Sequence, residues 1–248
     1  MNNLIKDDEN RVLGGKVVEY CKKYSIPIEY FFDIVEDQKV NPMMRGKGME
    51  YEIYLLLQKH LTPSEWIVQK LNLNPQPNMP DVDIGVTHRR TGIILKVEAK
   101  PSVRDSMNSG KKTKNYKVPH FKVKCHRSRS NISLSGSSND RYAVDTFDIV
   151  ITNPSNSIIK GKTIGPDLEL IQDEELLRIL FDYYKVGDME GLLKAINNDW
   201  RFVLPSEIAV EGFIPRTPYV LLENDPHWLP IGQIESKMLE IVRRMKRR

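Results

Sequence analysis

The spacing of hydrophobic residues along the chain changes near residue 65. Before this point apolar residues recur three and four positions apart, which predicts helices over residues 11–24, from Pro27 onward and over residues 49–61. The segment NPMMRGKG, residues 41–48, is rich in turn residues and predicts a break before the third helix. We therefore expect the first quarter of the chain to be helical.

After residue 65 short apolar runs, alternating or continuous, predict strands instead. These runs cover residues 66–69, 82–86, 92–100, 146–153, 206–210 and 218–224. The sequence THRRTG would join the second and third of them as a hairpin. Helical spacing returns over residues 173–185, 188–197 and 231–247. The predicted class is α/β, with a mixed central sheet of four or more strands flanked by helices.

The composition, 40% hydrophobic and 28% charged residues, is typical of a soluble globular protein. No apolar run approaches the roughly 18 residues that cross a bilayer, and MNNLIKDDENR lacks the apolar core of a signal peptide. Cys21 and Cys125 lie far apart and are expected to be reduced thiols. These features favour a cytoplasmic protein with no membrane partner.

Positive charge is concentrated in one part of the chain. Residues 89–129 contain 13 lysines and arginines against two acids, whereas the rest contains 24 basic and 31 acidic residues. A basic segment on an acidic-to-neutral body indicates a polyanionic partner, with nucleic acid the leading candidate.

Candidate chemistry lies in residues 80–100, PDVDIGVTHRRTGIILKVEAK. Residues two apart in a strand share a face, so Glu98 and Lys100 point the same way. The hairpin would bring Asp81, at the start of the neighbouring strand, close to both. Two adjacent carboxylates repel unless a cation or a proton neutralises them, and oxygen ligands suit Mg²⁺. A metal, a lysine that positions or helps deprotonate water, and a basic surface together indicate phosphodiester hydrolysis.

In these residues the sequence resembles the PD-(D/E)XK nuclease family. Pro80-Asp81 and Glu98-Ala99-Lys100 are similar to its signature, and GKGMEYEIYLLL and FDIVIT are similar to its first core helix and a core strand. The resemblance implies a restriction-endonuclease-like core. It also implies that Asp81, Glu98 and the Ala99 backbone carbonyl bind the metal, and that Lys100 is the catalytic lysine.

Two assignments stay open. Asp83 shares a face with Asp81 and is the alternative ligand, although Pro80 favours Asp81. On the helix, Glu52 and Glu50 each stand four residues after a glycine; we favour Glu52 slightly as the catalytic acid.

The basic segment, residues 101–142, contains the expected DNA-binding residues. A strand at HFKVKCHRSR would bury Phe121, Val123 and Cys125 and present a cationic row on its other face. The expected DNA contacts, to phosphates or to guanine edges, are Lys111, Lys112, Lys114, Lys117, Lys122, Lys124, His126, Arg127 and Arg129. Met43, Met44 and Arg45 form a possible minor-groove contact.

Residues 1–248 are expected to form a single domain: an N-terminal helical region to residue 45, the catalytic core over 46–152 and a C-terminal region over 153–248 for recognition or dimerisation. The predicted function is that of a type II restriction enzyme, which cuts double-stranded DNA to leave 5′-phosphate and 3′-hydroxyl ends. Mg²⁺ would be its cofactor, Mn²⁺ would substitute, and Ca²⁺ would bind without turnover.

A restriction enzyme implies a homodimer, a cognate DNA methyltransferase in the same system and a prokaryotic cytoplasm. Two alternatives remain: a Holliday-junction resolvase or repair nuclease with the same core, and a non-catalytic nucleic-acid-binding protein.

Overall fold

The computed structural model describes residues 7–71, 82–111, 117–126, 140–161 and 169–247. The described residues divide into two compact units, one ending at Lys47 and the other starting at Gly48. In the described part of the chain, every helix falls short of the length and hydropathy that crossing a membrane requires.

The first unit is helical. It contains α1 (Asp7–Tyr24), the 3-10 turn η1 (Ile28–Tyr30), α2 (Phe31–Glu36) and the beginning of α3 (Val40–His60). The prediction of a break over residues 41–48 is wrong, because α3 runs through them. Pro42 is tolerated there since it lies in the first turn, where a backbone N–H has no partner within the helix.

The second unit is built around a six-stranded sheet. In spatial order its strands are β1 (Trp66–Lys70), β2 (Ile84–His88), β3 (Ile94–Ala99), β5 (Ile149–Thr152), β6 (Arg201–Val203) and β8 (Leu229–Pro230). β3 and β5 are parallel and the other neighbours are antiparallel. This arrangement confirms the mixed sheet of four or more strands.

The β2–β3 hairpin has the register that positions the candidate site. Ile84 lies opposite Val97 and Thr87 opposite Ile94, and the turn between them is closed by a hydrogen bond from Gly92 N–H to His88 O. Gly92 has a φ of 70°, a conformation that glycine adopts without strain.

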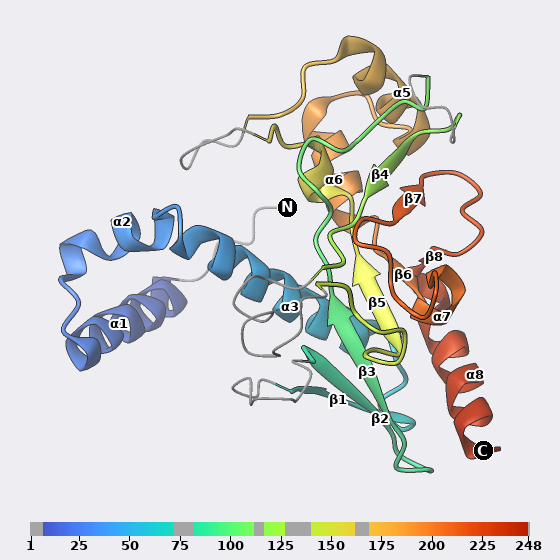
Figure 1. The fold of residues 1–248 in the computed structure, drawn as a ribbon. Coiled ribbons are helices and arrows are strands. Elements are labelled where there is room, and N and C mark those ends of the chain that lie inside the picture. The colour runs from blue at the N-terminus through green and yellow to red at the C-terminus, as the bar shows by residue number, and fades with distance from the viewer. Residues whose placement is uncertain (1–6, 72–81, 112–116, 127–139, 162–168, 248) are drawn as a thin grey trace. The chain divides into compact units, whose positions relative to one another are not determined.

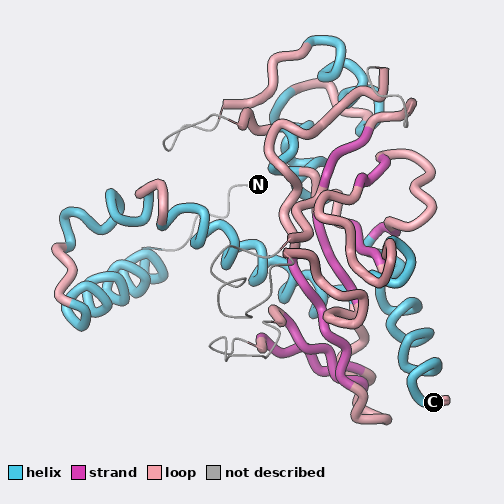
Figure 2. The backbone as a smooth tube through the Cα atoms, in the orientation of Figure 1, coloured by secondary structure: helices cyan, strands magenta, loops and turns pink. Residues whose placement is uncertain are grey.

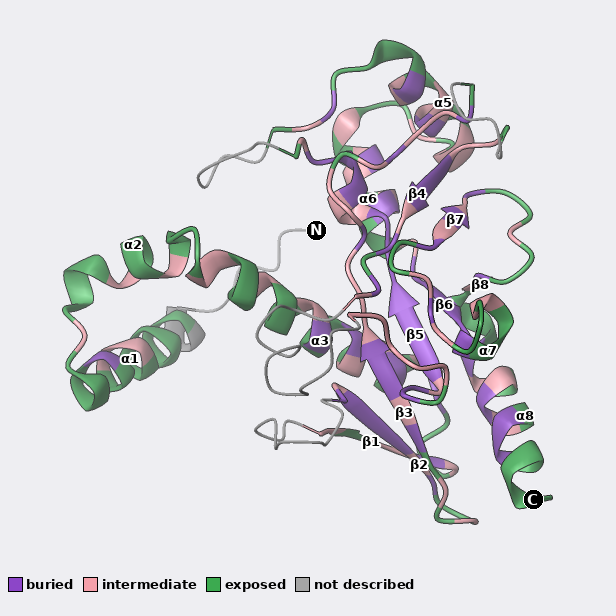
Figure 3. Ribbon diagram, viewed as in Figure 1, coloured by how far each residue is buried: buried purple, intermediate pink, exposed green. Residues whose placement is uncertain are grey.

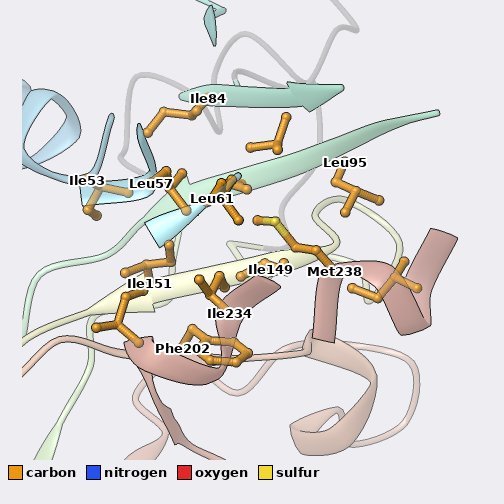
Figure 4. Close-up of a cluster of buried hydrophobic side chains, with 14 of the residues drawn as sticks. Ile53, Leu57, Leu61, Ile84, Leu95, Ile149, Ile151, Phe202, Ile234 and Met238 are labelled. Carbon is orange, nitrogen blue, oxygen red and sulfur yellow. The ribbon is translucent and has the colours of Figure 1, made fainter. Parts of the chain in front are cut away.

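One face of the sheet packs against α3 and α8 (Ile234–Lys246), and the 3-10 turn η3 (Ile231–Gln233) precedes α8. Ile149 and Ile151 of β5 point into this core, together with Phe202 of β6 (Figure 4). The predicted stripe of α8 is confirmed, since its four apolar members are all buried: Ile234, Met238, Ile241 and Val242.

The other face carries a second core. Val150 and Val203, which alternate with the residues of the first core, pack here against α5 (Glu174–Tyr184) and α6 (Met189–Asn198). Both helices were predicted, and Asp173 and Asp188 cap them by accepting backbone N–H bonds. A small second sheet of β4 (His120–Lys122) and β7 (Tyr219–Leu221) contributes to this core.

The sequence prediction differs from the structure at further elements of the second unit. Of residues 206–210, predicted as a strand, the first three instead follow Pro205 into the short helix α7 (Pro205–Ile208), and Val210 forms only an isolated β-bridge with Phe213. Proline fits the first turn of a helix, which explains this outcome. Strands β6 and β8, three and two residues long, were not predicted. A further 3-10 turn, η2 (Ser155–Ile158), follows β5. Both cysteines are buried and reduced, as predicted.

Candidate functional site

Asp83 directly precedes β2, and Glu98 lies near the end of the neighbouring strand β3. Ile84 and Val97 are paired in register and point into the core under α3, so Glu98, next to Val97 in β3, points the opposite way. The Asp83 carboxylate accepts a hydrogen bond from the Ala99 backbone N–H at 2.9 Å. The strand ends are thus joined through a side chain rather than by the backbone ladder alone.

Lys100 is held beside Glu98 at the end of β3. Its Nζ donates to Glu98 Oε1 at 2.5 Å, and only 12% of the lysine side chain and 6% of the glutamate side chain are exposed. The ammonium also lies 3.3 Å from the Tyr142 hydroxyl and 4.7 Å from the centre of the Tyr142 ring. Burial opposes the charge, but Glu98 and Tyr142 outweigh it and raise the pKa of Lys100 above its usual value. Lys100 is therefore a fixed cation at neutral pH.

A second buried ion pair joins α3 to β1. Lys70 Nζ donates to Glu50 Oε2 at 2.5 Å, and about nine-tenths of each side chain is buried. Lys70 also lies over the ring of Tyr51, 5.3 Å from its centre. Glu52, on the same helix, is exposed. Of the two acids left open by the sequence, the structure therefore places Glu50 inside the protein and Glu52 at its surface.

Charged groups of both ion pairs act on Asp83: Glu50 and Lys70 of one pair and Lys100 of the other. The pKa of Asp83 is raised to about 6. Burial is the largest cause, and the negative charge of Glu50 is the second. The Ala99 N–H, Lys100 and Lys70 act in the opposite direction. The pKa of Asp83 therefore depends on the charges of Glu50, Lys70 and Lys100.

Glu50, Lys70 and Lys100 thus all act electrostatically on Asp83, and Glu98 is linked to this group through its ion pair with Lys100. In the described residues, no three or more His, Cys, Asp and Glu side chains are arranged as a metal-holding group. The donor chemistry nevertheless suits a hard divalent cation, since Asp83, Glu98 and Glu50 supply carboxylate oxygens. Such a cation would relieve the repulsion that raises the pKa of Asp83. The residues present therefore fit Mg²⁺ in kind.

The Ala99 carbonyl faces the same side of β3 as its N–H, because both groups of one strand residue point in the same direction. Since the Ala99 N–H meets Asp83, the Ala99 carbonyl is also directed toward the β2 edge. This agrees in direction with a ligand role for Ala99. Asp81 lies outside the described residues.

Part of the basic segment runs directly beside this site. Lys124 N–H donates to Pro101 O at 3.0 Å, so the segment is hydrogen-bonded to the residue that follows Lys100. Phe121, Val123 and Cys125 are buried. The alternation predicted for this stretch is confirmed, although only His120–Lys122 forms a strand. Cys125 lies close enough to Lys100 to interact with its charge, and burial raises the pKa of Cys125 to about 12.

On the other face of this stretch, Lys124 is exposed, and Lys122 and His126 are half-buried. Lys122 lies over the ring of Tyr219, 5.3 Å from its centre, and His126 forms a β-bridge with Arg141. We call Lys122, Lys124 and His126 the cationic row. It lies on the opposite face of the stretch from Cys125, the residue that interacts with Lys100.

Only some of the remaining predicted DNA-binding residues lie in the described part of the chain. Lys117 is exposed, and Lys111 forms an ion pair with Glu175 of α5. Met43 and Met44 are exposed on α3 in the first unit, where Arg45 is half-buried. The others lie outside the described residues: Lys112, Lys114, Arg127 and Arg129.

Sequence reasoning did not find Lys70 or Tyr142. Lys70 is one lysine among many and lies 30 residues before Lys100, and its role depends on the pairing of β1 with β2. Tyr142 reaches Lys100 across 42 residues of sequence. The only sequence feature that pointed to Tyr142 was its position as an aromatic residue at the end of the basic segment.

Comparisons with models of protein families, with curated proteins and with solved structures found no match to this chain.

Proposed function

We propose that this protein is a Mg²⁺-dependent DNA endonuclease of the PD-(D/E)XK type that acts as a type II restriction enzyme. The observation that carries the proposal is the position of Asp83. Its carboxylate is hydrogen-bonded to the backbone between Glu98 and Lys100, and it is buried in the electrostatic field of Glu50. Buried charges that raise one another's pKa are costly for folding and are typical of functional sites.

Asp83, Glu98 and the Ala99 carbonyl would hold the metal, and the negative charge of Glu50 acts on Asp83. This assignment uses Asp83, the alternative to Asp81, because Asp83 is hydrogen-bonded at the centre of the cluster. When bound, Mg²⁺ would lower the pKa of a water molecule and stabilise negative charge on the phosphate.

Lys100 has a role that follows from its fixed charge. A lysine whose pKa is raised by a carboxylate and an aromatic hydroxyl stays protonated at neutral pH and is a poor general base. Lys100 would therefore orient the attacking water and stabilise the charge that develops on the phosphate, rather than act as a general base. Glu98 would position this ammonium group through their 2.5 Å contact.

The neighbouring cationic row supports a nucleic-acid substrate. Lys124, in the middle of the row, donates its backbone N–H to the carbonyl of Pro101, the residue after Lys100, so the row is attached to the end of β3. Lysines that neutralise phosphates release counterions, which favours binding of DNA of any sequence.

The decisive experiment is digestion of plasmid DNA by the purified protein with Mg²⁺, Mn²⁺, Ca²⁺ or EDTA, followed by sequencing of the ends. We expect discrete fragments with Mg²⁺ and Mn²⁺, binding without cleavage with Ca²⁺, and neither cleavage nor tight binding in EDTA. Lys100→Met should be inactive, and Lys96→Met, on the same strand, should remain active.

Other outcomes would favour the alternatives. Preferential cutting of four-way junctions over plasmid duplex would indicate a junction resolvase. DNA binding without metal-stimulated cleavage, in a protein that is folded by circular dichroism, would refute the nuclease proposal and favour a non-catalytic binding protein.

A further inference from the structure

The first unit buries very little apolar surface. Cys21 is its only buried hydrophobic residue among those described, and η1 and α2 bury none. Figure 3 shows α1 and α2 mainly in the colour of exposed residues. Ten large hydrophobic residues are exposed here: Val12, Leu13, Tyr20, Tyr24, Ile28, Tyr30, Phe32, Ile34, Met43 and Met44. Helices of this length need packing partners to be stable in water, so this surface requires a partner.

On α1 these residues form one continuous face. Leu13, Val17, Tyr20 and Tyr24 are spaced by four, three and four positions, which places them on a single stripe of the helix. Leu13 and Tyr20 are each 52% exposed and Tyr24 is 55% exposed, while Val17 is half-buried. Exposed aromatic and aliphatic side chains in this arrangement are typical of helix–helix interfaces.

The charge of α1 argues against nucleic acid as the partner. Its sequence contains four acidic and four basic residues, whereas residues 89–129 contain 13 basic residues against two acids. A polyanion would bind the basic segment and gain nothing from α1. A surface without net charge can instead meet a copy of itself without repulsion.

We infer that the apolar face of α1 binds the same face of α1 in a second copy of this chain, with the two helices antiparallel. In this direction Leu13 lies opposite Tyr24 of the second copy and Val17 lies opposite Tyr20, so each large ring meets a smaller side chain. A parallel pair would instead place Tyr20 against Tyr20. It would also bring the Lys22-Lys23 ends of both helices together.

The stripe alone is smaller than a stable dimer requires, since each partner typically buries about 800 Å². Ile28 and Phe32, which are 48% and 70% exposed in the same unit, offer the additional surface. The inference names a surface for the homodimer that a restriction enzyme requires, but it rests on the exposed residues and not on the proposed chemistry.

The test uses the full-length protein and analytical ultracentrifugation. Wild type should be a dimer, and Tyr20→Glu and Val17→Lys should each raise the dissociation constant by about 100-fold. A buried interface residue contributes about tenfold, and a two-fold interface contains each residue twice. Val210→Glu is the matched control: Val210 is 59% exposed in the other unit, and this change should leave the dimer intact.

Mixing the two charged variants tests the direction of pairing. In an antiparallel mixed dimer Glu at position 20 of one chain meets Lys at position 17 of the other, so association should return to within about tenfold of wild type. If either charged variant loses helical content by circular dichroism, Leu13→Ala and Tyr24→Ala replace it, each with a smaller expected weakening of about tenfold.

A monomeric wild type would overturn the inference, as would variants that remain fully dimeric. Mixed variants that fail to associate while each remains folded would overturn the antiparallel pairing. Cleavage assays on the same samples separate the two proposals: a dimer without nuclease activity counts only against the proposed function, and an active monomer counts only against this interface.

Discussion

The Asp83 carboxylate accepts a hydrogen bond from the Ala99 backbone N–H at 2.9 Å, across the ends of β2 and β3. This contact places a third acid next to the Glu98–Lys100 pair. Glu50 raises the pKa of the same carboxyl from α3, so four elements of the second unit meet at one group: α3, β1, β2 and β3. Asp83 is therefore the most informative residue to change.

Asp83→Asn should abolish Mg²⁺-dependent cleavage while making the metal-free protein more stable at neutral pH. The pKa of Asp83 rises from 3.8 to about 6 on folding. Because the folded state then binds the proton more tightly, the free energy of unfolding of wild type falls as pH rises from about 4 to 6. Asparagine can still accept the hydrogen bond from the Ala99 N–H but carries no charge. The free energy of unfolding of Asp83→Asn should therefore exceed that of wild type by on the order of 3 kcal/mol above pH 6.

Urea unfolding of both proteins between pH 3.5 and 8 measures this difference, which should disappear below about pH 4. A stability difference of equal size at every pH would show that Asp83 has an ordinary pKa. Asp148→Asn is the control for activity: Asp148 also accepts a backbone N–H, from Lys96 at 2.7 Å, but lies outside the candidate site. This variant should continue to cleave DNA.

Glu50 and Lys70 should shift the pKa of Asp83 in opposite directions. Glu50→Gln removes a negative charge and should lower it, whereas Lys70→Met removes a positive charge and should raise it. Carbon-13 NMR of the Asp83 carboxyl in the metal-free protein measures both shifts. Glu52→Gln is the matched control, since Glu52 is exposed on the same helix, and should change neither the pKa nor cleavage.

Shifts in the same direction for Glu50→Gln and Lys70→Met would contradict this electrostatic account. A loss of cleavage in Glu52→Gln but not in Glu50→Gln would assign the helical acid to Glu52 instead.

Lys100→Met should reduce cleavage at least about 100-fold and leave DNA binding nearly unchanged. It should also lower the free energy of unfolding by about 3 kcal/mol, because Glu98 would remain buried without its ammonium partner. Adding Glu98→Gln should restore most of the stability but none of the cleavage, as thermal unfolding and plasmid assays would measure. Recovery of cleavage in the double variant would exclude a catalytic role for both residues.

The cationic row should bind phosphates without regard to sequence. Changing Lys122 and Lys124 together to alanine should weaken binding to all duplexes alike. It should also reduce the slope of log affinity against log salt by about 0.9 for each lost phosphate contact. Fluorescence anisotropy over a salt series measures the slope. Lys59→Ala, an exposed lysine of α3, is the control; an unchanged slope in the double variant would place the row away from DNA.

The sequence by itself determined the elements whose signal is local. Helical spacing in residues 11–24, 173–185 and 188–197 gave helices because one stripe of each was apolar over several turns. The turn at Gly92 fixed the hairpin that aligns β2 with β3. The alternation of Phe121, Val123 and Cys125 predicted a stretch with one buried face, and the structure buries that face.

Local signals failed where context outweighed them. The glycines, proline and asparagine of residues 41–48 indicate a turn when read alone, yet α3 begins at Val40 and continues to His60. Its buried second half anchors Ile53 and Leu57 in the core, and the helix extends backward from that anchor. Strand β6, with three residues, was too short to give a periodic signal.

Only the tertiary structure decided which charged groups meet. The chain places Glu50, Lys70, Asp83 and Lys100 far apart, and no spacing rule selects Glu50 over Glu52 or identifies Lys70 among the lysines. That choice depends on which side of α3 faces the sheet and on the pairing of β1 with β2. The sequence shows which residues carry charge. Burial and the distances between them set the energy of those charges, and both are properties of the folded chain.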